Sequence, residues 1–218
     1  MATPRRAGRP RNPVPRERLL EVARDAFAEL GYAGASMSEI AGRADIRKSS
    51  LFHHFATKDA LYLEAVGATL APLGVLVVEA ATGEGSFGER LDRLGEAVSN
   101  YLGSHRQAAR LLVREVLDRG PFVAGEGRGA VQALLQTIRD FLAQGMADGL
   151  IPRRDPDHLT LTIIATHLFY FAAEPLVEGL SGRDLFDGAA VRQRREAVLS
   201  QIRALVGLPI AEDPATTG

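Results

Sequence analysis

Residues Ser36–Leu61, SMSEIAGRADIRKSSLFHHFATKDAL, decide the fold of the N-terminal part of the chain. They open with a capping-box pattern, in which the Ser36 hydroxyl accepts from a first-turn N–H and Glu39 reaches back to the Ser36 amide. A second short helix is predicted from about Arg47 to His54. Asp45 suits the turn between the two helices because Asp tolerates left-handed backbone. Two short helices joined by a tight turn form a helix-turn-helix unit.

The exposed face of the second helix is predicted to carry hydrogen-bond donors and no carboxylate. Its polar side chains are Arg47, Lys48, Ser49, Ser50, His53 and His54. Such a face suits phosphate oxygens and the acceptor-rich major-groove edge of guanine. The alternative is a solvated helix start, although cations at a helix N-terminus oppose the helix dipole. Thr57 is expected to cap the next helix, whose first turn, with Lys58, favours a phosphate.

The flanking segments add a basic arm and a bracing helix. Residues 1–15, MATPRRAGRPRNPVP, are rich in Pro, Arg and Gly and are expected to be disordered alone. Arg9 and Arg11 either enter a minor groove or lie along phosphates, or they belong to a solvated tail. A helix is predicted from Arg16 to Leu30 with Gly31 as its C-terminal cap. Its Phe27 is expected to pack against apolar residues of the next two helices: Ile40, Leu51 and Phe55.

Residues 31–61 resemble the DNA-binding domain of the tetracycline-repressor-like (TetR) family of transcriptional regulators. The matching positions are Gly31-Tyr32, Ser36, Ile40-Ala41, Ala44-Asp45-Ile46, Leu51-Phe52-His53-His54-Phe55 and Lys58. The resemblance covers about the first 65 residues, and beyond them only an all-helical layout agrees. Two positions depart from the family pattern. Asp45 replaces the usual Gly or Asn, and Phe52 replaces a Tyr that in the family commonly meets a phosphate, so that hydroxyl contact is absent here.

Composition and charge place the chain among ordinary globular proteins. It has 218 residues, of which 46% are hydrophobic and 24% charged, and it has no cysteine. A disulfide framework and a thiolate site are therefore excluded. Residues 1–60 hold 11 Lys and Arg against 7 Asp and Glu, a net charge of +4, while the remainder carries −5. A basic head on an acidic body is expected if only one end touches nucleic acid.

No targeting segment is recognised, so a cytoplasmic location is expected. Arginines and Glu17 interrupt any signal-peptide core. The apolar runs near Ala65–Val78 and Leu159–Ala173 are predicted to be too short to cross a bilayer.

The rest of the chain is predicted to be helical. The expected spans are 58–80, 87–103, 105–118, 129–149, 156–174 and 191–206, separated by Gly and Pro breaks. Pro72 is expected to kink its helix or end a turn. The sequence thus predicts an all-α protein of about nine helices. Its parts are an arm (1–15), a helix-turn-helix domain (16–62), a ligand-binding and dimerisation domain (63–210) and a tail (211–218).

Two patterns resemble cofactor or metal sites. Gly83–Gly88 satisfies G-x-G-x-x-G, but no acid follows about 20 residues later and no parallel sheet is predicted, which favours a flexible loop. The adjacent His53 and His54 point about 100° apart on a helix and lack an acid at the i+4 position. The sequence therefore predicts no cofactor, no metal site and no catalytic residue.

The resemblance implies that the last two helices pair with their copies in a homodimer. Helix 156–174 is apolar nearly all round and needs cover on both sides, and helix 191–206 carries one apolar stripe. The predicted interface residues are Leu161, Ile164, Leu168, Val191, Val198, Ile202 and Leu205. The alternative is that the stripe of the last helix belongs to the core of the monomer.

The resemblance also implies a small-molecule effector site in the body. Pockets are mostly apolar with a few polar groups. The candidate polar residues are Tyr101, Glu115, Thr162, Thr166, His167 and Tyr170, and the candidate apolar walls are Val98, Leu112, Phe141 and Phe169. Each polar residue has an alternative role as a core residue bonded to a neighbouring carbonyl.

The interpretation that follows is a homodimeric regulator, most often a repressor in this family. It would bind a palindromic double-stranded DNA operator and be released by a small, largely apolar effector. The rival functions are an enzyme with a helical cavity and a helical adaptor that binds proteins. No catalytic arrangement supports the enzyme.

Overall fold

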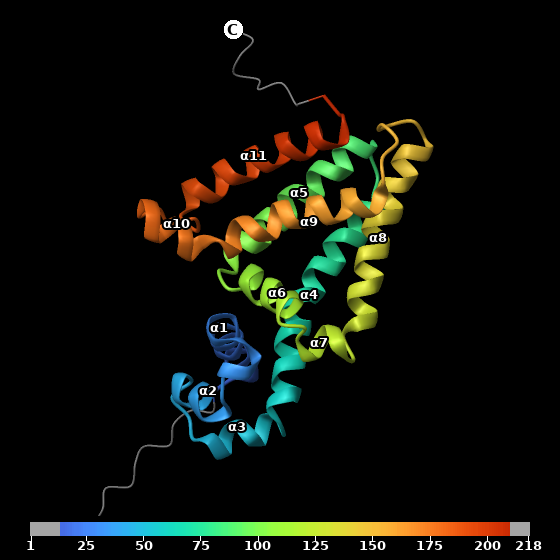
Figure 1. Cartoon of the computed structure of the whole chain (residues 1–218). Helices are drawn as coiled ribbons and strands as arrows, with labels where there is room; N and C mark the ends of the chain where they lie inside the picture. The colour runs from blue at the N-terminus through green and yellow to red at the C-terminus, as the bar shows by residue number, and fades with distance from the viewer. Residues whose placement is uncertain (1–13, 210–218) are drawn as a thin grey trace, which may run out of the picture.

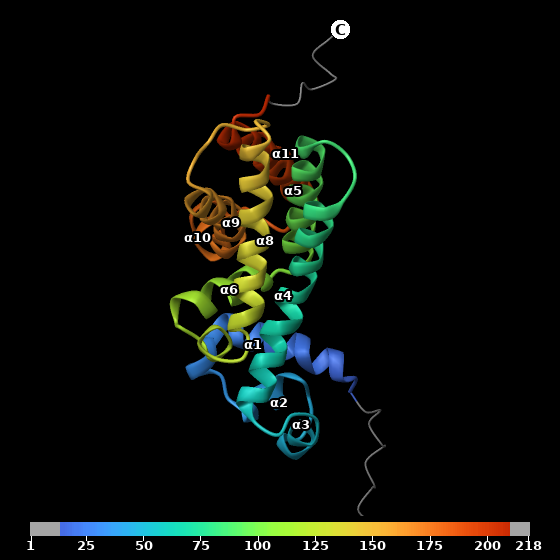
Figure 2. The same ribbon diagram turned by 90° about the vertical axis from the view of Figure 1, so that its right-hand side faces the viewer.

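The computed structural model describes residues 14–209, which form eleven helices and no strand. The helices are α1 (Arg16–Gly34), α2 (Met37–Arg43), α3 (Lys48–His54), α4 (Lys58–Thr82), α5 (Phe87–Ser104), α6 (Ala108–Leu117), α7 (Pro121–Ala124), α8 (Arg128–Ala147), α9 (Pro156–Ala172), α10 (Glu174–Ser181) and α11 (Gly188–Val206). The all-α prediction is confirmed. A small head of α1–α3 lies at one end, and α4 runs from it into a larger body (Figures 1 and 2).

The head is held by one apolar core. Phe27 of α1, Ile40 of α2, and Leu51 and Phe55 at α3 are all buried in the same cluster, which confirms the predicted packing. Leu61 and Tyr62 of α4 join this cluster, so the helix that enters the body is anchored in the head. The predicted domain boundary after residue 62 therefore lies inside the continuous helix α4.

Local chemistry explains the ends of the head helices. Gly31 has φ +73° and interrupts the helical geometry of α1, and Asp45 adopts the predicted left-handed backbone at φ +53°. The Ser36 hydroxyl accepts from the Glu39 N–H at 3.1 Å. The other half of the predicted capping box is wrong, because the Glu39 carboxylate pairs with Arg43 instead.

The body has its own apolar core, which joins α4, α5, α8, α9 and α11. The buried members include Val77, Leu91, Leu142, Ile163 and Val198. Pro72 lies inside α4, which continues to Thr82. The Gly83–Gly88 segment forms the α4–α5 connection and the start of α5, where Ser86 and Glu89 make a complete capping box. Because α4 is helical up to Thr82, the segment that leads directly into these glycines is a helix and not a strand.

Two short helices lie where the sequence predicts breaks. Both α7 and α10 begin with a proline in the first turn, Pro121 and Pro175. Proline suits that position because the first-turn N–H groups lack intrahelical partners and its φ is already helical. The prediction of about nine helices therefore falls two short.

The predicted lengths of the apolar runs need correction. Helix α4 is long and apolar enough to cross a membrane, and α9 and α10, bent by 49°, pass the same test as a pair. Length and composition alone are weak signals, because core helices satisfy them too. Leu61, Ala65, Leu73 and Val77 of α4 are buried in the two cores.

Candidate functional site

Helix α3 presents its polar side chains to solvent, as the sequence predicts. Leu51 and Phe55 point into the head core, whereas Lys48, Ser49, Ser50, His53 and His54 are exposed. Arg47 is exposed at the N-cap position, just before the helix. Ser36 and Thr57 are also exposed, each at the start of a neighbouring helix. Arg9 and Arg11 lie outside the described residues.

The cations of the head fall into two groups. Arg43 is held by Glu29 at 2.7 Å and by Glu39 at 3.1 Å, and Arg16 pairs with Glu64. By contrast, no carboxylate within residues 14–209 forms an ion pair with Arg24 of α1, or with the second group at α3 and the start of α4, which consists of Arg47, Lys48 and Lys58. These three charges are therefore available to an external anion such as phosphate.

Phe52 adds an apolar contact to the same face. Its side chain is 41% exposed, and the Lys48 Nζ lies 5.7 Å from its ring centroid. An exposed apolar ring suits contact with the methyl group of thymine, which projects into the major groove. It cannot donate the hydrogen bond that a tyrosine supplies.

Lys58 lies at the start of α4 as predicted, where Thr57 accepts from the Ala60 N–H at 3.0 Å. The Lys58 Nζ is 4.3 Å from the ring centroid of Tyr32. The Tyr32 hydroxyl donates to Asp59, and this hydrogen bond is the main reason why the pKa of Tyr32 is raised. The first turn of α4 therefore combines free N–H groups, the positive end of the helix dipole and the Lys58 ammonium, all of which attract a phosphate.

The paired histidines do not build a metal centre. The rings of His53 and His54 are 5.9 Å apart at 79°. Across residues 14–209, no three His, Asp or Glu side chains come together in a way that could hold a metal ion.

The predicted effector residues do not meet in one cavity. Glu115 binds Tyr62 in the head core, and the Tyr101 hydroxyl donates to the Thr69 carbonyl at 2.9 Å. Phe141 stacks on Phe87 at the other end of the body, 4.7 Å between centroids. The remaining apolar candidates, Val98 and Leu112, pack with the head-side core. The members of the predicted set thus face different packing layers in this structure.

The α9 members of that set divide between the inside and the outside of the body. Phe169 is 67% exposed and Thr162 is exposed, with its hydroxyl bonded to the His158 carbonyl. The Thr166 hydroxyl likewise bonds within the helix, to Thr162. His167 is buried, and burial together with the nearby Arg194 lowers its pKa to about 4. The remaining member, Tyr170, lies under the Arg194 guanidinium at 4.3 Å.

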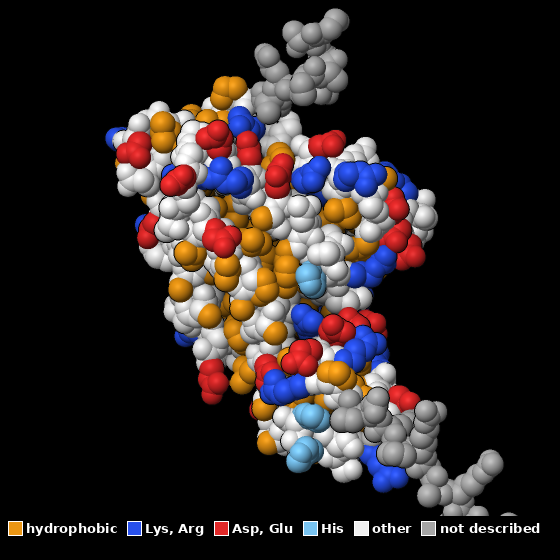
Figure 3. All heavy atoms as spheres, turned by 180° about the vertical axis from the view of Figure 1, so that it is seen from behind, with side chains coloured by type: hydrophobic (Ala, Val, Ile, Leu, Met, Phe, Trp, Pro, Cys, Tyr) orange, Lys and Arg blue, Asp and Glu red, His pale blue; other side chains and the backbone are white. Residues whose placement is uncertain are grey.

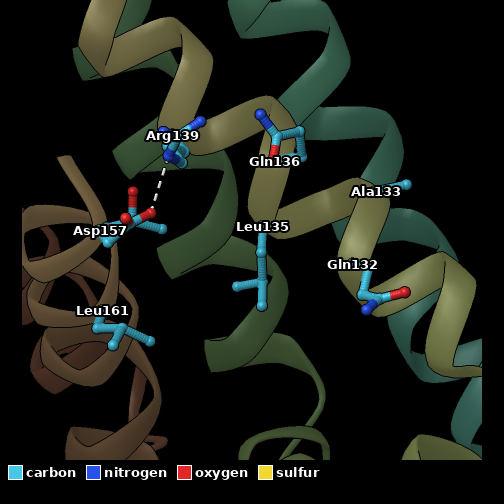
Figure 4. A pocket seen from close by; sticks show the side chains of 8 residues that line it. Gln132, Ala133, Leu135, Gln136, Arg139, Asp157 and Leu161 are labelled. Atoms are coloured by element: carbon cyan, nitrogen blue, oxygen red, sulfur yellow. Dashed lines mark ion pairs between the residues drawn. The ribbon is translucent and has the colours of Figure 1, made fainter.

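A different hollow lies between α8 and α9 (Figure 4). It is an open groove of about 600 Å³, lined by Gln132, Ala133, Leu135, Gln136, Arg139, Asp157, Thr160 and Leu161. Arg139 and Asp157 bridge the two helices at 2.9 Å. The buried Thr160 hydroxyl has no hydrogen-bond partner within the described chain. Sequence reasoning missed this groove because only the pairing of α8 with α9 brings the two polar rows together.

The predicted dimer stripe of α11 also needs correction. Val198 and Ile202 are buried in the monomer core, so a partner chain cannot reach them. Ile164, Leu168, Val191 and Leu205 are partly buried against the same protomer. Leu161 and Phe169 remain exposed on the outer face of α9, and α10 adds exposed Leu176 and Leu180, the latter 80% exposed.

The rear of the molecule has a different character. Hydrophobic side chains gather at mid-height there, and charged side chains cluster above and below them (Figure 3). Helix α4 contributes the exposed Val75 and Val78 to the apolar surface of the protein. Single exposed apolar residues are common on protein surfaces, and nothing in the structure shows what covers these two.

Comparison with known proteins covers both the head and the body. The family model of bacterial regulatory proteins of the tetR family matches residues 19–65. The model of the tetracyclin repressor-like C-terminal domain matches residues 88–202.

Named relatives extend this similarity. The HTH-type transcriptional regulator RutR of Escherichia coli is 29% identical over 191 residues, covering 83% of this chain and 84% of the relative. The HTH-type transcriptional repressor Rv3405c of Mycobacterium tuberculosis is 30% identical over 139 residues, covering 64% of this chain and 60% of the relative.

Solved structures share the fold. The TetR family regulator PfmR from Thermus thermophilus matches with a TM-score of 0.64 at 17% identity, covering 90% of this chain and 100% of that one. AibR, solved in complex with isovaleryl coenzyme A and operator DNA, matches with a TM-score of 0.66 at 18% identity, covering 85% and 96%.

Proposed function

The chain belongs to the TetR family of ligand-responsive, DNA-binding transcriptional regulators, and we propose that it is a repressor that binds a palindromic operator as a homodimer. A small effector releases it from DNA. The observation that carries this proposal is the cationic surface of exposed Arg47 and Lys48 and half-buried Lys58, none of which pairs with a carboxylate among residues 14–209. The protein acts in the cytoplasm, and its function is regulation rather than catalysis.

The two ends of this surface have different roles. Arg47, Lys48 and Phe52 of the α3 region face outward and read base edges in the major groove. Ser49, Ser50, His53 and His54 surround them. Lys58, at the start of α4, binds a backbone phosphate and sets the register. In a homodimer, two such surfaces about 34–36 Å apart read the two halves of a palindrome.

Dimerisation is assigned to the outer face of α9 and α10. Leu161 and Phe169 on α9 and Leu176 and Leu180 on α10 are exposed large apolar side chains. Helices α9, α10 and α11 lie on the same side of the body, away from the head (Figures 1 and 2). An apolar surface of this kind is typical of a protein interface.

The effector is assigned to the groove between α8 and α9. Its volume of about 600 Å³ lies within the usual range for small-molecule pockets. Leu135 and Leu161 supply apolar walls, and the exposed side chains of Gln132 and Gln136 supply polar groups. Leu161 also borders the proposed dimer face, so an effector there can alter the relative position of the two heads. The difference between the effector's affinities for the DNA-binding and the released conformations then sets how far DNA binding is weakened.

The test begins with a duplex that the wild-type protein selects from a random-sequence pool. Arg47→Ala and Lys48→Ala are expected to change base preference within each half-site, by about 1–3 kcal/mol at the affected position. Arg43→Ala is the matched control, because Arg43 is already paired with two carboxylates. The proposal fails if wild-type protein shows no salt-sensitive affinity for any duplex, or if only the control changes base preference.

A further inference from the structure

A buried carboxylate lies where the body meets the head. Glu115 of α6 is only 2% exposed. It accepts a hydrogen bond from the Tyr62 hydroxyl of α4 and another from the Val123 N–H of α7, the latter at 2.6 Å. A side chain at Gly120 would overlap this carboxylate, so the chain between α6 and α7 folds closely around it. Three helices therefore share one acidic group.

Such a group resists small displacements. A buried carboxylate is costly unless its hydrogen bonds are made, so loss of one donor leaves a large penalty. If α6 moves, Tyr62 either follows it or leaves Glu115 half-satisfied. The hydrogen bonds of Glu115 therefore oppose any separation of α6 from α4.

Aromatic contacts connect Tyr62 to Lys58, the cation at the start of α4. Its ring meets Phe27 edge-on at 4.8 Å and Tyr32 at 4.9 Å. Tyr32 lies under the Lys58 Nζ at 4.3 Å and donates to Asp59. A continuous series of contacts thus joins the Glu115 carboxylate to the first turn of α4.

Helix α6 also contacts the other side of the head. The Arg114 Nη2 donates to the Glu29 carbonyl of α1 at 3.1 Å. Figure 1 shows α6 between α1 and the upper helices of the body. A shift of α6 would therefore change its contacts with both α1 and α4, the two helices that support the helix-turn-helix unit.

We propose that Tyr62 and Glu115 are positioning residues for DNA binding, which act through Tyr32 to hold Lys58 in register with a phosphate. They touch no DNA themselves. The inference rests on the proposed function, since it assigns the residues through which the body sets the phosphate contact.

The test compares Tyr62→Phe with Thr69→Val in the full-length protein. Tyr62→Phe keeps the ring but removes one donor to Glu115. Thr69→Val removes a buried hydroxyl of the same helix, whose bond to the Ala65 carbonyl stays within α4. The probe is a labelled duplex selected from a random-sequence pool by the wild-type protein. We expect Tyr62→Phe to weaken binding by about fivefold or more, within the usual range of coupling between sites. Thr69→Val is expected to leave binding within about twofold.

A double-mutant cycle with Lys58→Ala identifies the route. In the Lys58→Ala background, Tyr62→Phe is expected to change affinity by less than about twofold, because its target is absent. Glu115→Gln, which keeps the side-chain shape, is expected to repeat the loss if Tyr62→Phe does not fold. The inference is overturned if Tyr62→Phe matches Thr69→Val, or if its effect is the same with and without Lys58. Either result leaves the proposed function intact, whereas absence of wild-type DNA binding removes the proposed function itself.

Discussion

Replacing Lys58 with alanine is expected to remove one phosphate contact from each protomer and leave the fold unchanged. The lost contact between Lys58 Nζ and the Tyr32 ring costs about 0.5–1 kcal/mol at a part-exposed site. Removing a cation from the start of α4 returns about 0.3–1 kcal/mol, because that cation opposes the helix dipole. The free energy of unfolding should therefore change little.

The effect on DNA binding follows from counterion release. Each phosphate contact contributes about 0.9 to the slope of log affinity against log salt, so two contacts per dimer contribute about 1.8. Between 50 and 200 mM salt, the variant should lose about tenfold less affinity than the wild type. Fluorescence anisotropy with the selected duplex at several salt concentrations measures both slopes.

Arg43→Ala serves as the control, since this arginine is already held by Glu29 and Glu39. Its salt slope should equal that of the wild type. If Lys58→Ala keeps the wild-type slope while Arg43→Ala lowers it, the assignment of the phosphate contact to α4 is wrong.

Three further predictions concern the read-out face, the dimer face and the core. Phe52→Tyr restores the hydroxyl that the family resemblance implies and should tighten operator binding by about 0.5–1.5 kcal/mol, measured by anisotropy; unchanged affinity would show that Phe52 lies away from phosphate. Leu176→Glu should raise the dimer dissociation constant at least about tenfold in analytical ultracentrifugation, because it places a charge in an apolar interface; an unchanged dimer contradicts the α10 assignment. The folded-state pKa of His167 is about 4, below the unfolded value, so stability should fall as pH drops from about 6.5 to 4, by up to about 3 kcal/mol. His167→Gln should flatten the pH dependence of the unfolding free energy measured by urea titration. An unchanged pH profile would show that His167 does not cause this dependence.

The helix-turn-helix region could be predicted because its signals are local. The Ser36 and Thr57 caps, the left-handed backbone at Asp45 and the burial of Leu51 all depend on residues a few positions apart. Local chemistry of this kind survives folding with little change. The prediction that Glu39 completes the capping box is wrong, because its carboxylate pairs with Arg43 one turn later in the same helix.

The body was harder to predict because its sites depend on which helices become neighbours. Val198 and Ile202 have a regular apolar spacing, but spacing does not say whether the stripe meets a partner or its own core. The groove between α8 and α9 is lined from both helices, by Gln136 of α8 and Asp157 of α9 among others, and it exists only because these two helices pack together. Glu115 is recognisable as a polar residue in an apolar helix, but its partner Tyr62 lies 53 positions away in the sequence.

DNA binding by the small cationic surface at α3 and the start of α4 can be measured by footprinting of the selected duplex. The wild-type protein is compared with an Arg47→Ala, Lys48→Ala, Lys58→Ala triple variant at the same concentration. We expect two protected segments about one helical turn apart with the wild type and no protection with the triple variant. Equal protection by both proteins would show that this surface does not bind the duplex.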